Sequence, residues 1–355
     1  MRLVSSRRGL GLAALAAAAL MSACSTPEPV VVVEAPPPPP PPPPVTLNAG
    51  VAEAASIYVS FIRDVGTIRA GFPDAESIQV AMRKGAAYDP ATLSRGMIAY
   101  ASILALQSPE FVAGVRTFAN DPQQRSEVVA NIIRDPAYAA TLPGADKAAG
   151  LIIATLGQDI AALTVVADAV EQDAYTIQER GDPRRRWAVT PIPNREVRLE
   201  TAKTISAGHM LPSAEESARL FAAANSGSGL NLPAATNAPP YTPAVVNALA
   251  IAALAAMGAA GDDARANTEA LSIETNAQFC LDMSKLNLFQ CLAASRPSYE
   301  DMFCVGRHIV RDLATCTTAA TVPTVASPTL AATPVPADAA VEAATVAVSP
   351  APASR

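Results

Sequence analysis

Four cysteines near the C-terminus are the residues whose type and spacing most directly suggest a chemical role. They occur in FCLDMSKLNLFQC and MFCVGRHIVRDLATC, so that Cys280 precedes Cys291 by eleven residues and Cys304 precedes Cys316 by twelve. Such a set binds a metal, supplies a reactive thiol or forms disulfides. A zinc site usually takes its thiolates from closely spaced pairs, and a redox-active site favours C-x-x-C, which the sequence lacks. We therefore expect two structural disulfides and no metal.

The sequence between the cysteine pairs predicts how the disulfides are connected. Arg296-Pro297-Ser298 breaks the helical pattern, and two helices joined by so short a loop are antiparallel. The nested pairing, Cys280–Cys316 with Cys291–Cys304, fits one antiparallel register because the residue numbers of the two pairs have nearly the same sum. Cysteines eleven residues apart on one helix are separated by about 16 Å, which no disulfide spans, and the crossed pairing requires parallel helices.

One feature of the nested pairing is irregular. Eleven residues return almost to the same helical face, whereas twelve overshoot it by about 120°. We therefore expect Cys316 to lie where its helix is ending. The arrangement is similar to the twin-cysteine hairpins of coiled-coil-helix–coiled-coil-helix proteins, although its spacings are longer, and the resemblance implies a shared geometry without a shared function. Structural disulfides are typical of an oxidising compartment such as the periplasm.

The fifth cysteine, Cys24, lies at the end of a leader-like segment. A positively charged start is followed by an Ala/Leu/Gly run over residues 9–20 that is too short to span a bilayer. The stretch LMSAC resembles the lipobox of bacterial lipoproteins, with Met21 where Leu or Val is more frequent. This resemblance implies that residues 1–23 are a signal peptide, that Cys24 carries a diacylglyceryl group, and that Ser25 permits sorting to the outer membrane. The alternative is an ordinary secreted protein cut by the general signal peptidase.

The composition divides the chain after Cys24 into further segments. Residues 24–49 form a tether whose run Pro36–Pro44 favours a polyproline helix of about 28 Å, either as a spacer or as a ligand for a proline-binding module. Residues 50–225 are expected to form a helical bundle, residues 226–241 a Gly/Ser/Asn/Pro linker, and residues 242–316 a C-terminal helical region. Residues 317–355 contain few large apolar or charged side chains, which predicts a disordered tail.

Capping signals and apolar spacing predict an all-α fold for the body. Side chains that cap helices precede proline at Asp89, Ser108, Asp121 and Asp135, and Ser213 with Glu216 matches a capping box. The longest helix is expected over residues 145–179, because apolar residues recur there in alternating steps of four and three. A helix starting at Pro243 is apolar but short, and is expected to be buried rather than to span a membrane. The apolar seam of the longest helix consists of Ala149, Ile153, Leu156, Ile160, Leu163, Ala167, Val170, Ala174 and Ile177.

The charge of the chain limits the classes of partner. The formal net charge is −6, and loss of the three arginines in residues 1–23 would make the mature chain more acidic still. Nucleic acid requires a basic surface, so it is not expected as a partner. An acidic body held at a membrane by acyl chains is consistent with this composition. The expected partners are the membrane, through the lipid anchor, and another envelope protein.

One basic segment stands out from this background. Residues 179–203 contain seven basic residues, and the sequence Arg184-Arg185-Arg186-Trp187 includes the only tryptophan. Arginine binds phosphate or carboxylate through two parallel hydrogen bonds, and indole stacks on other groups or lies at lipid interfaces. These four residues are therefore candidates for contact with an anionic lipid, a peptide carboxylate or an acidic partner. The alternative is that the arginines pair with acids of the same chain while Trp187 closes the end of the bundle.

Signals for catalysis are weak. The two histidines, His209 and His308, lie in no recognised nucleophile, metalloprotease or phosphate-binding motif, and no cofactor is expected. We predict a non-enzymatic scaffold or interaction module attached to the periplasmic face of the outer membrane. The alternatives are a periplasmic hydrolase that uses unrecognised carboxylates or His209, and an accessory lipoprotein of a secretion or export machine. A buried His209 facing an acid in a cleft would favour the hydrolase, and an exposed His209 together with the absence of a basic groove would favour the scaffold.

Overall fold

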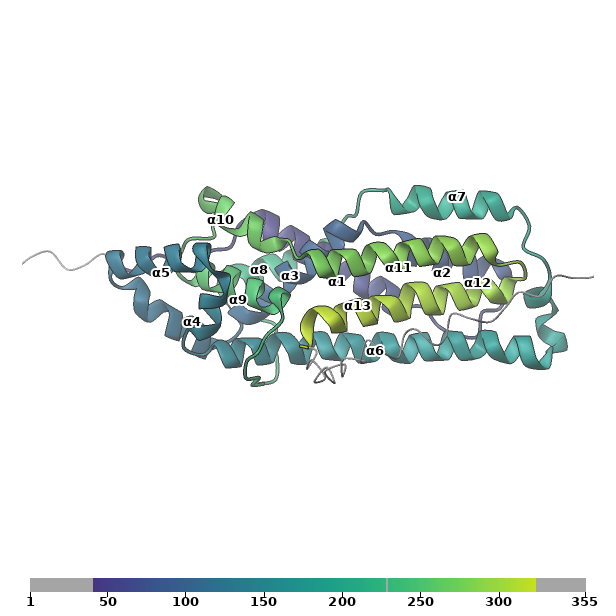
Figure 1. Ribbon diagram of the computed structural model, residues 1–355, viewed down its shortest axis with the longest axis horizontal. Helices are drawn as coiled ribbons and strands as arrows, with labels where there is room; N and C mark the ends of the chain where they lie inside the picture. Colours follow the sequence, from purple (N-terminus) through teal and green to yellow (C-terminus); the bar gives the residue numbers. More distant parts are fainter. Residues whose placement is uncertain (1–40, 228, 324–355) are drawn as a thin grey trace, which may run out of the picture. The chain divides into compact units, whose positions relative to one another are not determined.

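The computed structural model describes residues 41–227 and 229–323, which belong to one compact unit. In these residues the fold is all-α, as predicted, with two isolated β-bridges and no strand (Figure 1). The predicted signal peptide, Cys24, part of the proline run and most of the predicted tail lie outside the described residues. The principal helices are α1 (Ala49–Gly66), α2 (Ala75–Ala86), α3 (Pro90–Leu106), α4 (Pro109–Arg116), α5 (Pro122–Arg134), α6 (Ala145–Arg180), α7 (Arg195–Ser206), α8 (Ala214–Ser226), α9 (Pro243–Ala256), α10 (Ala266–Glu269), α11 (Thr275–Ala294), α12 (Ser298–Val305) and α13 (Asp312–Thr321).

The predicted helix starts are confirmed in the structure. Asp89, Ser108 and Asp121 each accept a backbone N–H of the following first turn, at 2.8 to 3.3 Å, with proline at its start. Asp135 caps in the same way, but the segment that follows is the 3₁₀ helix Pro136–Thr141. The hydroxyl of Ser213 accepts the backbone N–H of Glu216 at 3.2 Å, as the predicted capping box requires. The carboxylate of Glu216 instead forms ion pairs with Arg63 and Arg219.

The longest helix occupies the predicted position and buries the predicted seam. Helix α6 begins at Ala145, ends at Arg180, and packs against α3, α12 and α13. Seven of the nine predicted seam residues are buried, and Ile153 and Ile160 are partly buried against the same core. Because the four-and-three spacing places all nine on one stripe, partner helices need to cover only that stripe.

Two further contacts assemble the core around α6. Helix α9 is buried along almost its whole length, as predicted for the segment beginning at Pro243. Helices α1 and α3 cross closely at Gly96, where a Cβ atom would lie 2.6 Å from the carbonyl oxygen of Ala54 and 2.8 Å from the Cβ of Tyr58. Only glycine permits this approach.

The regions before and after residues 226–241 pack together in the same unit rather than forming separate bodies. The described part of this coil lies against α6, where the backbone N–H of Asn237 donates to the carbonyl oxygen of Asp146 at 2.9 Å. Lys147 adds a side-chain hydrogen bond to Thr236 at 2.7 Å. The segment therefore follows the surface of the bundle closely.

The C-terminal hairpin has the predicted nested disulfides. Cys280 on α11 bonds to Cys316 on α13, with 5.6 Å between the Cα atoms, and Cys291 bonds to Cys304 on α12, with 5.7 Å. Helix α13 continues past Cys316 to Thr321, so the expectation that the helix ends near Cys316 is wrong.

A π-helical turn explains how twelve residues return to the same face. Residues Gly306–Arg311 between α12 and α13 form this turn, η6. A π-turn inserts one extra residue into an α-helix, so the twelve residues advance like eleven and finish within about 20° of the starting face. The two cysteines of the returning helical arm, Cys304 and Cys316, therefore lie on one face, as do Cys280 and Cys291 on α11.

Candidate functional site

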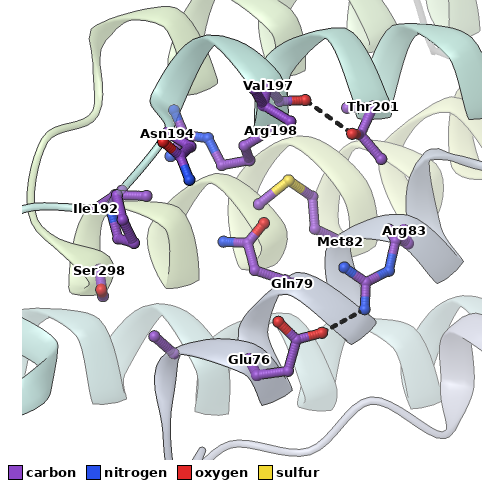
Figure 2. Close-up of a pocket in the computed structure, with 13 residues that line it drawn as sticks. Glu76, Gln79, Met82, Arg83, Ile192, Asn194, Val197, Arg198, Thr201 and Ser298 are labelled. Carbon is purple, nitrogen blue, oxygen red and sulfur yellow. Dashed lines mark hydrogen bonds and ion pairs between the residues drawn. The ribbon is translucent and has the colours of Figure 1, made fainter.

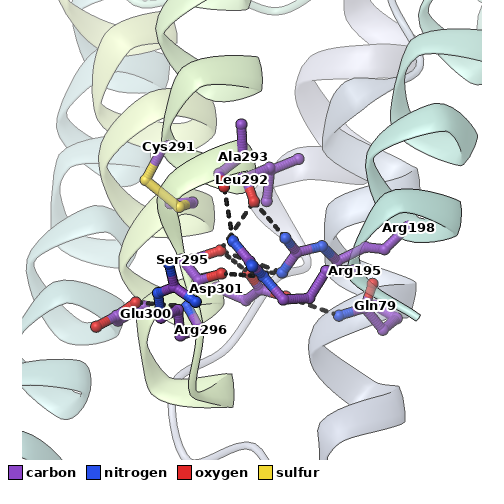
Figure 3. Close-up of polar contacts among 11 residues, drawn as sticks. Gln79, Arg195, Arg198, Cys291, Leu292, Ala293, Ser295, Arg296, Glu300 and Asp301 are labelled. Carbon is purple, nitrogen blue, oxygen red and sulfur yellow. Dashed lines mark hydrogen bonds and ion pairs between the residues drawn. A yellow bond between two sulfur atoms is a disulfide. The ribbon is translucent and has the colours of Figure 1, made fainter. Parts of the chain in front are cut away.

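Two arginines of the basic segment cap the C-terminal end of α11 (Figure 3). Arg195 donates to the backbone oxygens of Ser295 and Ala293, each at 2.7 Å. Arg198, one turn further along α7, donates to the backbone oxygen of Leu292. The last carbonyls of a helix have no partner within the helix and carry partial negative charge, so two cations at this position satisfy them and favour the helix dipole.

The guanidinium of Arg198 also forms the centre of a buried polar cluster. It pairs with the carboxylate of Asp301, which is 0% exposed, and donates to the hydroxyl of Ser295 at 3.1 Å. Asp301 accepts further hydrogen bonds from Ser295 at 2.7 Å and from the side-chain amide of Gln79 at 3.0 Å. This cluster joins α2, α7, α12 and the end of α11 beside the Cys291–Cys304 disulfide (Figure 3). Because both carboxylate oxygens of Asp301 are occupied, the cluster is suited to hold helices in place.

A groove between α2 and α7 lies beside this cluster, and Arg198 and Gln79 belong to both (Figure 2). The volume of the groove is about 260 Å³. Its apolar wall includes Met82, Ile192 and Val197, and the side chain of Val197 is 65% exposed although valine is large and apolar. Arg198 and Gln79, both engaged with Asp301, also line the groove. A concave, largely apolar surface on a fixed support is the kind of site that accepts an anchoring side chain.

The rim of the groove is polar. Glu76 and Arg83, seven residues apart on α2, form an ion pair at 2.6 Å; the side chain of Glu76 is largely exposed to solvent and that of Arg83 is partly exposed. On the α7 side lie Asn194 and Thr201, whose hydroxyl donates to the backbone oxygen of Val197 at 2.7 Å. The groove therefore combines an apolar wall with a hydrogen-bonding edge.

The position of α7, which forms one wall, is fixed at both ends. Before the helix, the backbone N–H of Ile192 donates to the carbonyl oxygen of Arg296 at 2.8 Å. Asn194 then adopts a positive φ of 52°, a conformation that asparagine tolerates better than most residues, and this turns the chain into α7. At the other end, the hydroxyl of Ser206 donates to the carbonyl oxygen of Ala86 at 2.9 Å.

The four predicted contact residues do not form one exposed cluster. They lie in the 3₁₀ helix η3 (Pro183–Val189), where Arg185 forms a two-point ion pair with Asp173 and lies 5.9 Å from the centre of the Trp187 ring. Burial opposes ionisation of Asp173, but hydrogen bonds from Arg185 and the Gly71 backbone outweigh it and lower the pKa of the carboxyl group. Arg184 and Arg186 are exposed, so these two side chains face solvent while Arg185 and Trp187 contribute to packing.

The two histidines lie in different surroundings. His209 is exposed, which was expected to favour a scaffold over a hydrolase. Nδ1 of His308 lies 3.1 Å from the carboxylate of Asp312, one turn along the same face, and its ring packs edge-on against Phe303. Within residues 41–227 and 229–323, no group of three His, Cys, Asp or Glu side chains is placed to hold a metal ion.

Two titratable groups with shifted pKa values were not identified from the sequence. Burial lowers the pKa of Lys285 to about 8, and its ammonium group donates to the backbone oxygens of Ala86 and Tyr88 while lying 3.8 Å from the centre of the Tyr88 ring. Burial also raises the pKa of Asp159 on α6 to about 6, against the opposing effect of Arg63. The sequence contained a signal for each group. Asp159 interrupts the apolar pattern of α6, and Lys285 lies between apolar residues of α11.

The shifted pKa of Asp159 predicts a pH-dependent stability change. Because its folded pKa of about 6 lies above the ordinary value of 3.8, the ionised carboxylate destabilises the folded state above about pH 6. Asp159→Asn is therefore expected to raise the free energy of unfolding by about 1–3 kcal/mol near pH 7.5. The gain should shrink as the pH falls through 6 and nearly vanish near pH 4. Chemical denaturation of both proteins at these two pH values measures it, and an equal gain at both would contradict the assignment.

One helix in the described part of the chain is long and apolar enough to cross a membrane by length and composition. This is α6, and a second candidate arises only if α3 and α4 with its 3₁₀ extension count as one span across a bend of 81°. One stripe of α6 packs into the core described above. Core helices of bundles share this length and composition.

No protein-family model matches the chain, and no curated protein and no solved structure matches it either. The interpretation of the groove therefore depends on its own geometry.

Proposed function

We propose that the chain is a membrane-anchored envelope lipoprotein that acts as a non-enzymatic interaction module, and that the groove between α2 and α7 is its contact site for another envelope protein. The observation that carries the proposal is the exposed Val197 beside a cavity whose floor is fixed by the Arg198–Asp301 cluster. Interfaces commonly depend on a few apolar anchors in pockets with a polar rim. The groove offers this combination on a surface that needs little reordering on binding.

The state of the polar groups supports a binding role rather than catalysis. Asp301 and Arg198 neutralise one another in the interior, and Glu76 pairs with Arg83 at the rim. A hydrolytic site needs a nucleophile or an activated water within reach of a base. In the groove lining, the carboxylate of Glu76 is paired with Arg83 and the hydroxyl of Thr201 donates to the backbone oxygen of Val197, so neither is paired with the other as nucleophile and base. The groove is therefore better suited to a peptide side chain than to a reacting substrate.

The anchoring part of the proposal rests on the first segment of the chain. The leader that resembles a lipobox implies an acyl chain on Cys24, and Ser25 permits sorting to the outer membrane. Two disulfides in a small hairpin are consistent with folding in an oxidising compartment. Metabolic labelling with a palmitate analogue tests this directly: Cys24→Ser should abolish the label and release the protein from the membrane fraction. If the Cys24→Ser variant still carries the label and still remains in the membrane fraction, the predicted lipid anchor is refuted.

The contact site is tested by a matched pair of apolar-to-acidic substitutions. Val197→Asp places a charge in the groove and is expected to reduce recovery of crosslinked partner proteins at least tenfold. Val165→Asp is the control, because Val165 is 68% exposed on α6, away from the groove lining. Equal recovery with both variants would overturn the assignment of the groove, and recovery of the components of a secretion or export machine would identify an accessory role.

The exposed arginines of η3 give a separate prediction. Arg184→Ala with Arg186→Ala is expected to weaken binding to an acidic partner or an anionic membrane several-fold while leaving the fold intact, because both side chains are exposed. Arg185 is retained because its ion pair with Asp173 joins η3 to α6. Sedimentation with anionic vesicles and affinity capture measure the two effects separately. Unchanged binding in both assays would show that the basic turn is structural.

A further inference from the structure

A second groove, between α6 and α12, is lined largely by aromatic side chains. Its volume is about 200 Å³. Aromatic residues make up 5% of the chain but three of the six residues in this lining, so the groove concentrates a residue type that is scarce elsewhere. We call it the α6–α12 groove, and its lining consists of Ala174, Tyr175, Gln178, Tyr299, Glu300 and Phe303.

The aromatic rings come from two helices that pack side by side (Figure 1). Tyr299 and Phe303 are four residues apart on α12 and therefore lie on one face of that helix. Tyr175 on α6 contacts Phe303, with 5.7 Å between the ring centres and 62° between the ring planes. Rings at this angle form two walls of a corner rather than a flat stack. Tyr175 is 44% exposed, so its ring is accessible to a ligand.

The α12 wall of the groove is held in place by contacts on its other side. Asp301, which lies between Tyr299 and Phe303 in the sequence, belongs to the buried cluster with Arg198. The residue after Phe303 is Cys304, which forms the disulfide with Cys291. A site whose walls are ordered before binding loses less conformational entropy when it captures a ligand.

The surroundings of the groove are negatively charged. Glu300 is the only charged residue of the lining, and its carboxylate accepts the backbone N–H of Arg296 at 2.7 Å. No basic side chain in the described part of the chain forms an ion pair with it. In an adjoining hollow on α6, Arg311 pairs with both Asp168 and Glu171. The two linings together hold three carboxylates and one guanidinium, so they attract a positively charged ligand.

We propose that the α6–α12 groove binds a small quaternary or methylated ammonium cation. The faces of aromatic rings carry partial negative charge and attract such cations, whose alkyl groups also pack against the rings. Glu300 supplies the opposite charge. The volume of about 200 Å³ is below the roughly 300–1,000 Å³ of sites for drug-sized ligands, so it suits a compact free cation. This site is separate from the groove between α2 and α7 and does not depend on the contact proposed there.

Calorimetric titration of the full chain in phosphatidylglycerol nanodiscs tests the proposal, because this lipid carries no ammonium group. Choline is the probe, and its neutral isostere, in which carbon replaces the nitrogen, is the control for apolar binding alone. Choline is expected to bind at least about tenfold more tightly than the isostere, because the rings and Glu300 act on its charge. Absence of choline binding, or equal affinities for the two compounds, would overturn the proposal.

Substitutions at Tyr175 test whether choline binds in the α6–α12 groove. Tyr175→Leu removes one ring and is expected to weaken choline binding about tenfold, whereas Tyr175→Phe keeps the ring and should remain within about twofold of the wild type. Phe221→Leu is the matched control, because Phe221 is 53% exposed on α8 and outside the lining. Equal effects of Tyr175→Leu and Phe221→Leu would contradict the site.

A substitution at Glu300 tests the charge without altering the rings. Glu300→Gln keeps an oxygen that can accept the backbone N–H of Arg296 but removes the negative charge. It is expected to weaken choline binding several-fold and to leave binding of the neutral isostere unchanged. Unchanged choline affinity would overturn the assignment of Glu300 as the opposite charge.

Nanodiscs that contain phosphatidylcholine distinguish a free cation from a lipid headgroup, which carries the same ammonium group. If the groove takes a free cation, the affinity for choline should be the same in these nanodiscs as in phosphatidylglycerol. Loss of choline binding only where phosphatidylcholine is present would show that the headgroup occupies the groove, and would overturn the assignment to a free cation.

Discussion

Replacing Asp301 with alanine is expected to lower the free energy of unfolding by about 3–5 kcal/mol, one of the two largest effects that we predict. The substitution leaves the guanidinium of Arg198 buried without its counter-ion, and burying an uncompensated charge is far more costly than losing a surface pair. The hydroxyl of Ser295 and the amide of Gln79 lose their acceptor at the same time. Because these groups come from four parts of the fold, the loss should also loosen α7 and change the groove.

Two comparisons separate this mechanism from general sensitivity to substitution. Glu76→Ala, which removes the exposed ion pair with Arg83, should change the free energy of unfolding by less than about 1 kcal/mol. The double variant Asp301→Leu with Arg198→Met, which removes both charges, should recover part of the lost stability, because apolar replacement of a buried pair is often tolerated. Urea denaturation of the oxidised proteins measures all three. A loss with Asp301→Ala no larger than that with Glu76→Ala would show that the cluster does not hold the helices.

Removal of the outer disulfide is the second large effect. Cys280→Ser with Cys316→Ser is expected to reduce the free energy of unfolding by about 4 kcal/mol, and the corresponding change at Cys291 and Cys304 by about 3 kcal/mol. The order follows from the chain enclosed, since the sequence separations are 36 and 13 residues and a longer closed loop restricts the unfolded chain more.

Peptide mapping without reductant should recover the two nested pairs, and denaturation of each double-serine variant should show the larger loss for the outer bridge. The single-pair variants retain one bridge each and serve as mutual controls. A crossed pairing or free thiols in the folded protein would contradict the hairpin. A larger loss for the inner bridge would show that native-state effects outweigh the restriction of the unfolded chain.

Features that depend on short stretches of sequence could be predicted. The caps at Asp89, Ser108 and Asp121 act on backbone groups within three residues of themselves, and the seam of α6 reflects the helical period alone. The disulfide pairing followed from a short loop and the length of a helix. The twelve-residue spacing on the returning arm contained the signal for the π-turn, but an early helix end was inferred in its place, and α13 extends to Thr321.

The site depends on which helices become neighbours, and the sequence carries little information about that. Arg198 and Asp301 are separated by 103 residues, and no local pattern pairs them. Arg195 and Arg198 lie three residues apart and so share a helical face, which could have suggested a common target, but the target itself is the end of α11. The groove exists because Asn194 turns the chain and Ser206 holds the far end of α7, and both effects arise only in the folded chain.

The most direct test of the central claim is site-specific photocrosslinking in living cells. A photoreactive amino acid at position 197, in the groove, is compared with the same residue at position 165 on α6, and crosslinked proteins are identified by mass spectrometry. The account predicts a defined set of envelope proteins from position 197 and a lower, unspecific yield from position 165. Indistinguishable products from the two positions would contradict the groove as a contact site and would direct attention to small ligands and enzymatic assays.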